Sequence, residues 1–276
     1  MFILRERNPD THKGDYGKVL IVAGSKGMAG AAVLCARSAL RSGAGLVQVS
    51  VPDELVPIVQ TSVPEATCVD REKIVDTLDR YDAVVFGPGI GTGGEEATLL
   101  QKILEKYEKP MVIDADGLNI LGQHESPDLL KDTHANIIIT PHVGETMRLL
   151  KLTGEENKTY SRLELARMLQ GQTGATVVLK GHETLVLAGQ DFWVNTTGNP
   201  GMATGGSGDV LSGIIGSLCG QGFETWTAAK MGVYIHGLAG DLAKEELGEY
   251  GMIAGDLCHY TAKAMQLMVK REKERK

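Results

Sequence analysis

Short apolar segments rich in β-branched residues recur along the first two thirds of the chain, with helical patterns between them. Their residues are apolar at successive rather than alternate positions, which is typical of strands buried between two helical layers. The helical segments between them can serve as crossovers, so the pattern predicts an α/β fold with a doubly wound, mostly parallel sheet between helical layers. The expected strands are KVLIVAGS from Lys18, GLVQVSVP from Gly45, DAVVFGPG from Asp82, PMVIDAD from Pro110, NIIITPH from Asn136 and TVVLKG from Thr176.

Late in the chain the pattern changes to a hairpin followed by helices. TLVLAGQDFWVNTT is typical of two short strands around Gly189, Gln190 and Asp191, which adds antiparallel structure at an edge. The later segments GDVLSGIIGSLCG, TWTAAKMGVYIHGLAGDLAKEEL and AGDLCHYTAKAMQLMVKREKERK carry Ala, Leu and Met at helical spacing. We find no linker, repeat or low-complexity segment, so a single domain is expected over residues 1–276.

Composition and charge narrow the class of partner. The 276 residues are 42% hydrophobic and 23% charged, as in ordinary globular proteins, and the net charge is −7. Nucleic acids and anionic membranes require a concentrated excess of Lys and Arg, so the charge argues against both. The 35 glycines exceed the usual share of about 7%, which favours close approach of the backbone to a small molecule.

The cysteines and the longest apolar runs bear on the cellular compartment. Cys35, Cys68, Cys219 and Cys258 lack the paired spacing of a zinc or redox site, and a chain of this size needs no disulfides. No apolar run reaches the roughly 18 residues that a membrane-spanning helix requires. We therefore expect four reduced thiols and a cytoplasmic location.

Ligands of open α/β sheets bind beyond the carboxyl ends of the strands, so unusual residues just after strands carry the most weight. In FGPGIGTGGEE, Gly89, Gly91 and Gly94 satisfy G-x-G-x-x-G, and Asp114 and Asp116 follow at about the distance of a ribose-binding acid. This spacing leaves a Rossmann-type oxidoreductase open as an alternative. Against it, the fingerprint belongs on the first strand of a unit, and this strand is at least the third.

Two further segments place polar residues after strands. In TPHVGE, His142 and Glu145 are three residues apart on a starting helix, so both would face the strand ends, with Glu145 helping to hold Mg²⁺ carried by a nucleotide. In LKGHET, Lys180 ends a strand, where it would either meet a phosphate as a point charge or remain a surface lysine.

The segment GMATGGSGDVLSGIIG has six glycines in sixteen residues. Gly205, Gly206 and Gly208 precede a helical pattern, so unobstructed N–H groups and the positive end of a helix dipole would converge on an anion. The spacing is not that of a Walker A loop. Asp209 would either satisfy the helix dipole or act as a general base for a hydroxyl that attacks a phosphoryl group; its place beside an anion site favours the base.

Together, HKGDYGKVLIVAGS, FGPGIG, VIDADGLN, ITPHVGE, VVLKG and NPGMATGGSGDVLSGIIG resemble the ADP/ATP-dependent NAD(P)H-hydrate dehydratases of the ribokinase-like superfamily, from His12 to about Asp241. The resemblance implies that hydrated NADH or NADPH (NADHX or NADPHX) is restored to the reduced cofactor. Its C6 hydroxyl would receive a phosphoryl group from ADP or ATP, and phosphate would then be eliminated. Phosphate is a far better leaving group than water.

The resemblance also implies roles for particular residues. Asp209 would be the catalytic base and contact the hydrate together with Ala32, Gly91 and His142. The expected nucleotide contacts, including the glycines of the anion site, are Lys180, Gly181, His182, Glu183, Thr184, Gly205, Gly206 and Gly208. Glu145 stands where related kinases keep the acid of an N-x-x-E motif that organises Mg²⁺, although His142 replaces the Asn of that motif.

Further expectations follow from the family. Stand-alone bacterial members use ADP in most cases, which favours ADP over ATP as co-substrate with Mg²⁺, and the family implies a homo-oligomer, a tetramer. Because the chain starts directly at the dehydratase part, an NAD(P)HX epimerase would be a separate protein. Three alternatives remain: a ribokinase-like kinase of a vitamin precursor such as hydroxyethylthiazole or hydroxymethylpyrimidine, the NAD oxidoreductase, and a non-catalytic nucleotide sensor.

Overall fold

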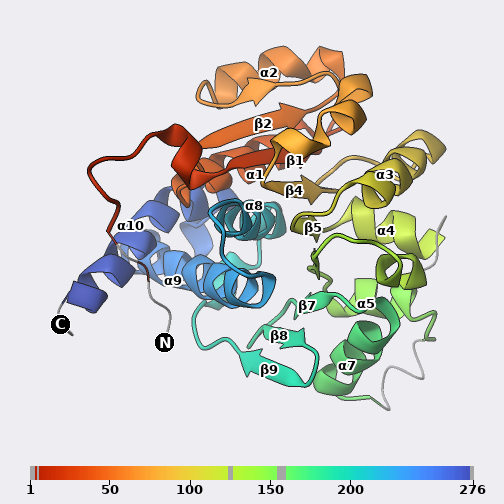
Figure 1. Ribbon diagram of the computed structural model, residues 1–276. Coiled ribbons are helices and arrows are strands. Elements are labelled where there is room, and N and C mark those ends of the chain that lie inside the picture. Colours follow the sequence, from red (N-terminus) through yellow and green to blue (C-terminus); the bar gives the residue numbers. More distant parts are fainter. Residues whose placement is uncertain (1–3, 5, 124–126, 154–159, 274–276) are drawn as a thin grey trace.

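The computed structural model of the chain describes residues 4, 6–123, 127–153 and 160–273. A single sheet of nine strands runs through these described residues (Figure 1). Its strands are β1 (Lys18–Val22), β2 (Leu46–Ser50), β3 (Thr67–Cys68), β4 (Ala83–Phe86), β5 (Met111–Ile113), β6 (Ile137–Ile139), β7 (Thr176–Leu179), β8 (Leu185–Ala188) and β9 (Asp191–Val194).

The sheet is mixed but mostly parallel. Its strand order is β3-β2-β1-β4-β5-β6-β7-β8-β9, with parallel pairing from β3 to β7 and antiparallel pairing in β7–β8 and β8–β9. The order reverses between β1 and β4, because β1 pairs with both β2 and β4. The predicted doubly wound sheet and the late hairpin are therefore confirmed.

The carboxyl ends of the central strands are level with one another. The register places Val22 of β1 opposite Ser50 of β2 and Phe86 of β4, and Phe86 opposite Ile113 of β5. Ile113 in turn pairs with Ile139 of β6. As a result, the loops that leave these strands all emerge at one edge of the sheet.

Helices cover both faces of the sheet, and each face has its own apolar core. On one face lie α1 (Ala29–Arg41), α2 (Val56–Ser62), α8 (Ser207–Gly220), α9 (Thr225–Gly251, with a non-helical Gly248) and α10 (Ala254–Lys273). On the other lie α3 (Gly94–Lys106), α4 (Asp116–Gln123), α5 (Val143–Leu149) and α7 (Arg162–Thr173). Figure 1 shows the α9–α10 pair at the opposite end of the molecule from α3 and α4.

The sequence did not predict β3 and α2, which lie between β2 and β4 in the chain. β3 is two residues long and lies at the sheet edge, where a strand needs no continuous apolar run. α2 has seven residues, and Val59 is the member that it buries. Elements this short leave little periodic signal in a sequence.

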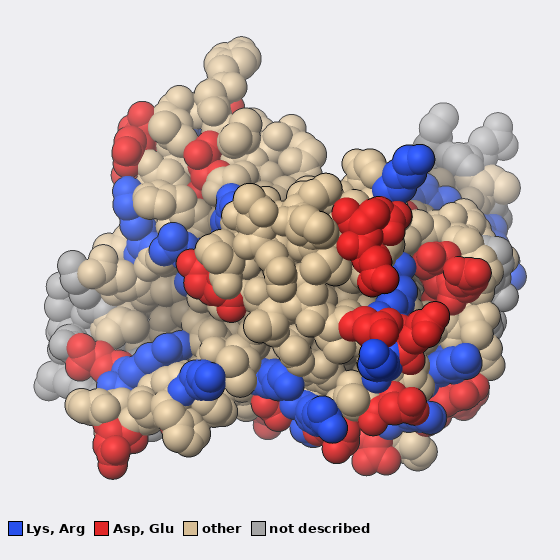
Figure 2. All heavy atoms as spheres, turned by 90° about the horizontal axis from the view of Figure 1, so that it is seen from above, with Lys and Arg blue, Asp and Glu red and all other residues tan. Residues whose placement is uncertain are grey.

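Three observations bear on the expectations drawn from apolar runs, charge and cysteines. Among the described residues, no helix combines the length and the apolar character that crossing a membrane demands. Figure 2 shows acidic and basic side chains interspersed over the face seen from above, with several acidic groups gathered at one side. The four cysteines are free, and Cys35, Cys219 and Cys258 are buried.

Candidate active site

Polar residues converge at the sheet edge where β5, β6 and β7 end and α8 begins. Asp114 follows β5 directly, Pro141 and His142 follow β6, and Lys180 follows β7. The backbone N–H of Lys180 donates to the carbonyl of Pro141 at 2.8 Å, and Lys180 forms a parallel bridge with His142. The register of the strands thus brings together side chains that lie far apart in the chain.

Asp114 is the centre of this group. Its carboxylate is 1% exposed, and it accepts hydrogen bonds from Lys180 Nζ at 2.7 Å and from Ser212 Oγ at 2.6 Å. Ser212 lies on α8, one turn beyond Asp209. Burial opposes the charge of the Lys180 ammonium, but nearby Asp114, Glu145 and Asp209 more than offset it, so the pKa of Lys180 is raised above its usual range. Lys180 therefore remains a cation at this edge.

Asp209 lies in the first turn of α8 and is partly buried. Burial is the main cause that raises the pKa of its carboxyl to about 7, followed by the charge of Asp114; Lys180 acts in the opposite direction and Asp116 adds a smaller increase. A carboxyl with a pKa near neutrality is suited to take a proton from a hydroxyl and to release it again. The environment of Asp209 favours the predicted base over a helix-dipole role alone, since a dipole role needs no such burial.

The glycine loop that precedes Asp209 is shaped by its close neighbours. Gly206 has φ of +91° at the N-cap of α8, and a Cβ there would lie 2.4 Å from Leu34 Cδ1. A Cβ on Gly208 would lie 3.4 Å from Lys180 Nζ, whereas one on Gly205 would meet no atom within 4 Å. The start of α8 thus opens beside the Lys180 ammonium, and the two together form a site suited to an anion.

His142 and Glu145 cap α5 reciprocally. The His142 N–H donates to Glu145 Oε2 at 2.7 Å, and the Glu145 N–H donates to His142 Nδ1 at 3.1 Å. Glu145 is buried and its Oε2 lies 3.9 Å from Lys180 Nζ, whereas the His142 side chain is 53% exposed. The capping box explains the spacing of this pair structurally, and His142 Nε2 lies 3.6 Å from Glu145 Oε1.

The loop from Lys180 to Thr184 is held from outside by Arg162 of α7. The Arg162 guanidinium donates to the carbonyls of Leu179 at 3.1 Å and of His182. Thr184 Oγ1 donates to the Gly181 carbonyl at 2.9 Å, and Glu183 adopts a positive φ of +54°. Gly181, His182 and Glu183 are exposed at this edge, next to the Lys180 ammonium.

The structure also places the remaining predicted contacts. Gly91, with φ of +92°, donates its N–H to Asp116 Oδ2 at 2.9 Å, and a Cβ there would meet no atom within 4 Å. Ala32 is fully buried near the start of α1, where a Cβ on Gly24 would lie 3.3 Å from its own Cβ. The role of Ala32 as a hydrate contact stays a prediction, as do the other residue roles inferred from the resemblance.

The acids of the dinucleotide fingerprint have partners within the chain. Asp116 accepts from Gly91, and Asp114 is held by Lys180 and Ser212. The glycines themselves follow β4 rather than the first strand of the sheet. This arrangement does not favour the Rossmann-type oxidoreductase, in which an acid is free to bind a ribose.

Sequence reasoning missed two polar residues at this site. Ser212 was read as part of a helix, although its position three residues after Asp209 puts it on the same helical face. His236 of α9 lies 3.3 Å from Ser207 Oγ through Nε2, and burial lowers its pKa to about 4, so it is neutral. No local motif marks either of them, because their partners come from distant elements.

The described residues contain no group of three or more His, Cys, Asp or Glu arranged to hold a metal ion. Glu145 and Asp114 are the carboxylates closest to Lys180 Nζ by measured contacts. Both already have partners: Asp114 accepts from Lys180 and Ser212, and Glu145 accepts from the His142 N–H, but each carboxylate keeps further acceptor sites toward a cation that arrives with a ligand.

Known proteins resemble this chain over most of its length. A family model described as NAD(P)H-hydrate dehydratase matches residues 19–263. The chain is 40% identical over 259 residues to an ADP-dependent (S)-NAD(P)H-hydrate dehydratase of Neisseria meningitidis, covering 92% of this chain and 87% of that protein. It is 38% identical over 279 residues to a bifunctional NAD(P)H-hydrate repair enzyme of Thermofilum pendens, covering 96% of this chain and 53% of the enzyme. The chain thus spans about half the length of the bifunctional relatives that it matches.

The fold has close counterparts among solved structures. The ADP/ATP-dependent NAD(P)H-hydrate dehydratase of Bacillus subtilis, co-crystallised with ATP and Mg²⁺, superposes with a TM-score of 0.86 at 29% identity, covering 96% of this chain and 95% of that chain. Solved structures of ribokinase-like proteins share the same architecture, so the predicted ribokinase-like fold is confirmed.

Proposed function

The chain belongs to the NAD(P)H-hydrate dehydratase family, and we propose from this that it restores the (S)-epimers of NADHX and NADPHX to NADH and NADPH with consumption of ADP. The observation that carries the proposal is the pairing of Asp209, whose pKa is about 7, with an anion site formed by the start of α8 and Lys180. That pairing supports transfer of a phosphoryl group to a hydroxyl.

The first step forms a phosphate ester. The C6 hydroxyl oxygen of the hydrated ring attacks the terminal phosphorus of ADP, Asp209 takes the hydroxyl proton, and the bond from that phosphorus to the bridging oxygen breaks to release AMP. Lys180, held by Asp114 at 2.7 Å, and the N–H groups of Gly208 and Asp209 in the first turn of α8 stabilise the negative charge of the phosphates.

The second step removes the phosphate. The bond between C6 and the ester oxygen breaks, the ring loses its C5 proton, and the C5–C6 double bond of the reduced nicotinamide forms. The C5 proton leaves with the phosphate as hydrogen phosphate, and Asp209 returns the hydroxyl proton to solvent. Hydrate and ADP thereby become reduced cofactor, AMP, inorganic phosphate and one proton. We assign Gly91 and His142 to the hydrate because both are open at the same strand edge as Asp209. Gly181, Glu183 and their neighbours would hold the nucleotide beside Lys180.

Mg²⁺ fits this site as an ion that arrives with the nucleotide. Glu145 would hold it through its buried carboxylate, and the ion would supply positive charge against the phosphates. ADP is favoured as co-substrate because the relative from N. meningitidis is named as ADP-dependent. The bifunctional name of the T. pendens relative supports an NAD(P)HX epimerase as functional partner. We also propose that the protein assembles as a homotetramer and is located in the cytoplasm.

A direct assay tests the function. Purified protein is incubated with NADHX, Mg²⁺ and either ADP or ATP, and the absorbance of reduced nicotinamide is followed. We expect recovery of NADH with release of AMP and phosphate, and a loss of at least 100-fold in kcat for Asp209→Asn, because general-base catalysis contributes about 10²–10⁴-fold. Asp128→Asn is the matched control and should retain full activity, because Asp128 is an exposed acid in the first turn of the 3-10 helix Pro127–Lys131.

The assay separates the competing functions. A vitamin-precursor kinase would yield a stable phosphorylated product from hydroxyethylthiazole or hydroxymethylpyrimidine and no NADH from NADHX. Full activity in Asp209→Asn would remove the base assignment while leaving the dehydratase. No recovery of NADH with either nucleotide would contradict the proposed function itself.

A further inference from the structure

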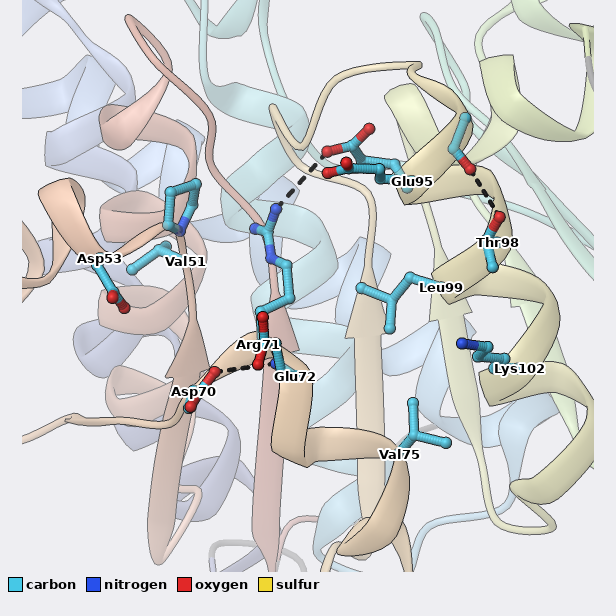
Figure 3. Close-up of a pocket in the computed structure, with 13 residues that line it drawn as sticks. Val51, Asp53, Asp70, Arg71, Glu72, Val75, Glu95, Thr98, Leu99 and Lys102 are labelled. Carbon is cyan, nitrogen blue, oxygen red and sulfur yellow. Dashed lines mark hydrogen bonds and ion pairs between the residues drawn. The ribbon is translucent and has the colours of Figure 1, made fainter.

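A cavity of about 780 Å³ opens at the same sheet edge, on the far side of Gly91 from Lys180. It lies between the ends of β2 and β3 and the first turns of α3, as Figure 3 shows. Its lining includes Val51, Asp53, Arg71, Val75, Leu99 and Lys102. No residue of this lining has a role in the phosphoryl transfer described above. The volume is within the range of about 300–1,000 Å³ typical of small-molecule pockets.

The wall of the cavity that carries Asp53 and Arg71 lies across the reversal point of the strand order from Asp114, whereas the α3 wall follows β4. Asp53 and Arg71 follow β2 and β3, whereas Asp114, which contacts the Asp209 helix through Ser212, follows β5. The order β3-β2-β1-β4-β5 places the β1/β4 crevice between them. Doubly wound sheets bind dinucleotides across such a crevice, with one nucleotide on each side.

The loops of the crevice join the two sides. The Gly24 N–H donates to the Pro88 carbonyl at 2.9 Å, and Ser25 Oγ donates to the Gly89 carbonyl at 2.8 Å. Gly91 is three residues before Gly94, which lines the cavity. Gly94 has open space at its Cβ position and no positive φ, so the fold itself does not require glycine there. The backbone between Gly91 and the cavity is thus open at Gly91 and Gly94, whereas the Glu96 carboxylate lies over Gly93, 2.6 Å from where a Cβ would stand.

The cavity wall combines apolar surface with hydrogen-bonding groups. Val51, Val75 and Leu99 provide aliphatic surface suited to the faces of an adenine ring. The Arg71 guanidinium donates to the carbonyls of Ala23 and Gly24 at 3.1 and 3.2 Å, and its buried Nε has no hydrogen-bond partner. Figure 3 shows Arg71 extended toward the end of the cavity where Glu95 lies.

We propose that this cavity binds the adenosine monophosphate half of the hydrated dinucleotide while its hydrated ring lies at Asp209. The proposal rests on the proposed function, because it assigns the remainder of the same substrate. ADP occupies the other side, beside Lys180 and the loop that follows β7. The two nucleotides then approach Asp209 from opposite ends of the sheet edge, and neither blocks the other.

Substitutions that fill the cavity test the proposal. Leu99→Trp and Val75→Trp each place an indole in the cavity from a different wall. Gln101→Trp adds the same side chain at an exposed position of α3 outside the lining, and is the matched control. Steady-state rates are measured with saturating ADP and Mg²⁺ on NADHX and on the hydrate of reduced nicotinamide mononucleotide, which lacks the adenosine half. Thermal unfolding verifies that each variant folds.

We expect the cavity variants to raise KM for NADHX at least tenfold, with kcat and the KM for ADP unchanged. Their kcat/KM for the mononucleotide hydrate should equal that of the unaltered protein, and Gln101→Trp should behave normally with both substrates. Unchanged KM for NADHX in both folded cavity variants, equal losses on both substrates, or a raised KM for ADP would overturn the proposal. If the unaltered protein dehydrates neither hydrate, the proposed function has failed instead.

Discussion

Asp209 is a carboxyl group that its surroundings make difficult to ionise. Burial and the charges of Asp114 and Asp116 raise its pKa to about 7, and Lys180 offsets this only in part because Asp114 holds the ammonium at 2.7 Å. The same contacts that make Asp209 a base near neutral pH therefore store an unfavourable charge in the folded protein above pH 7. Function and stability are opposed at this residue.

The sign of the effect on stability follows from the direction of the shift. Because the pKa of folded Asp209 is about 7 and the pKa of an unfolded Asp is 3.8, the folded state binds more protons between these values. Stability from this group is fully present below pH 3.8 and is lost as pH rises to about 7. Asp209→Asn cannot ionise, so we expect its free energy of unfolding to exceed that of the unaltered protein by about 4 kcal/mol at pH 8 and by about 1.5 kcal/mol at pH 5.

Urea denaturation of the ligand-free protein at pH 5 and pH 8 measures this difference. Asp128→Asn, at an exposed acid, should show no comparable gain at either pH. A variant at Asp209 that is no more stable at pH 8 than at pH 5, relative to the unaltered protein, would contradict the raised pKa.

Single residues of the site differed in how far the sequence predicted them. The sequence predicted four of them from their places at strand ends and helix starts: Asp209, Lys180, His142 and Glu145. Ligands of open α/β sheets bind beyond the carboxyl ends of the strands, and those ends can be recognised from local pattern alone. Asp114 was noticed only as a possible ribose acid. Its actual partners, Lys180 and Ser212, are 66 and 98 residues away in the chain, and such pairing depends on strand order.

At the scale of elements, α8 must pack closely to place Asp209. The glycine-rich sequence was interpreted as backbone cleared for phosphate, but its later glycines serve packing. A Cβ on Gly213 would lie 2.1 Å from Ser38 Oγ and 2.2 Å from the Cys35 carbonyl of α1. A Cβ on Gly216 would lie 2.2 Å from Val85 Cγ2 of β4. These glycines let α8 approach both α1 and the sheet.

Alanine at Gly216 should therefore destabilise the protein by about 2 kcal/mol, as overpacking of a core does, and should also lower kcat because α8 carries Asp209. Gly171→Ala in α7 is the matched control, since its Cβ would meet no atom within 4 Å. There we expect a gain of about 0.5–1 kcal/mol from the better helix propensity of alanine. Urea unfolding of both variants gives the comparison, and equal effects of the two substitutions would refute close packing at Gly216.

Elements were predictable in proportion to their length and burial. The fully buried runs of β1 and β4 carry a continuous apolar signal, and the hairpin of β8 and β9 carries its turn residues. β3 is a two-residue edge strand, and the sequence did not predict it because its pairing with β2 depends on the tertiary structure. The packing roles of Gly213 and Gly216 were not predicted, because the sequence does not reveal what faces them.

At the scale of the whole molecule, both proposed ligands are anions that approach an acidic protein. The net charge is −7, and the cavity lining holds Asp53, Asp70, Glu72, Glu95 and Glu96 against Arg71 and Lys102. Arg71 is further engaged by backbone carbonyls and lies 3.8 Å from Glu96. On the proposed function and the proposed adenosine site, the ribose of the substrate meets mainly carboxylates. These accept hydrogen bonds from a 2′-hydroxyl and repel a 2′-phosphate.

This charge distribution predicts a salt-dependent choice of substrate. NADPHX carries about two more negative charges than NADHX, so repulsion should make kcat/KM for NADPHX the lower of the two at low salt. The screening length falls from about 30 Å at 0.01 M to about 8 Å at 0.15 M ionic strength, so added KCl should weaken that repulsion and reduce the preference for NADHX several-fold. Rates on both hydrates at fixed ADP and Mg²⁺, across this range of KCl, measure the ratio of kcat/KM for NADHX to that for NADPHX.

Charge-reversal variants test whether the cavity causes the preference. Lys102→Glu should enlarge the preference for NADHX at low salt, since it adds a carboxylate to the cavity, whereas Lys263→Glu, at an exposed position of α10, should not. A ratio that is independent of salt and of Lys102 would place the 2′-phosphate away from this cavity.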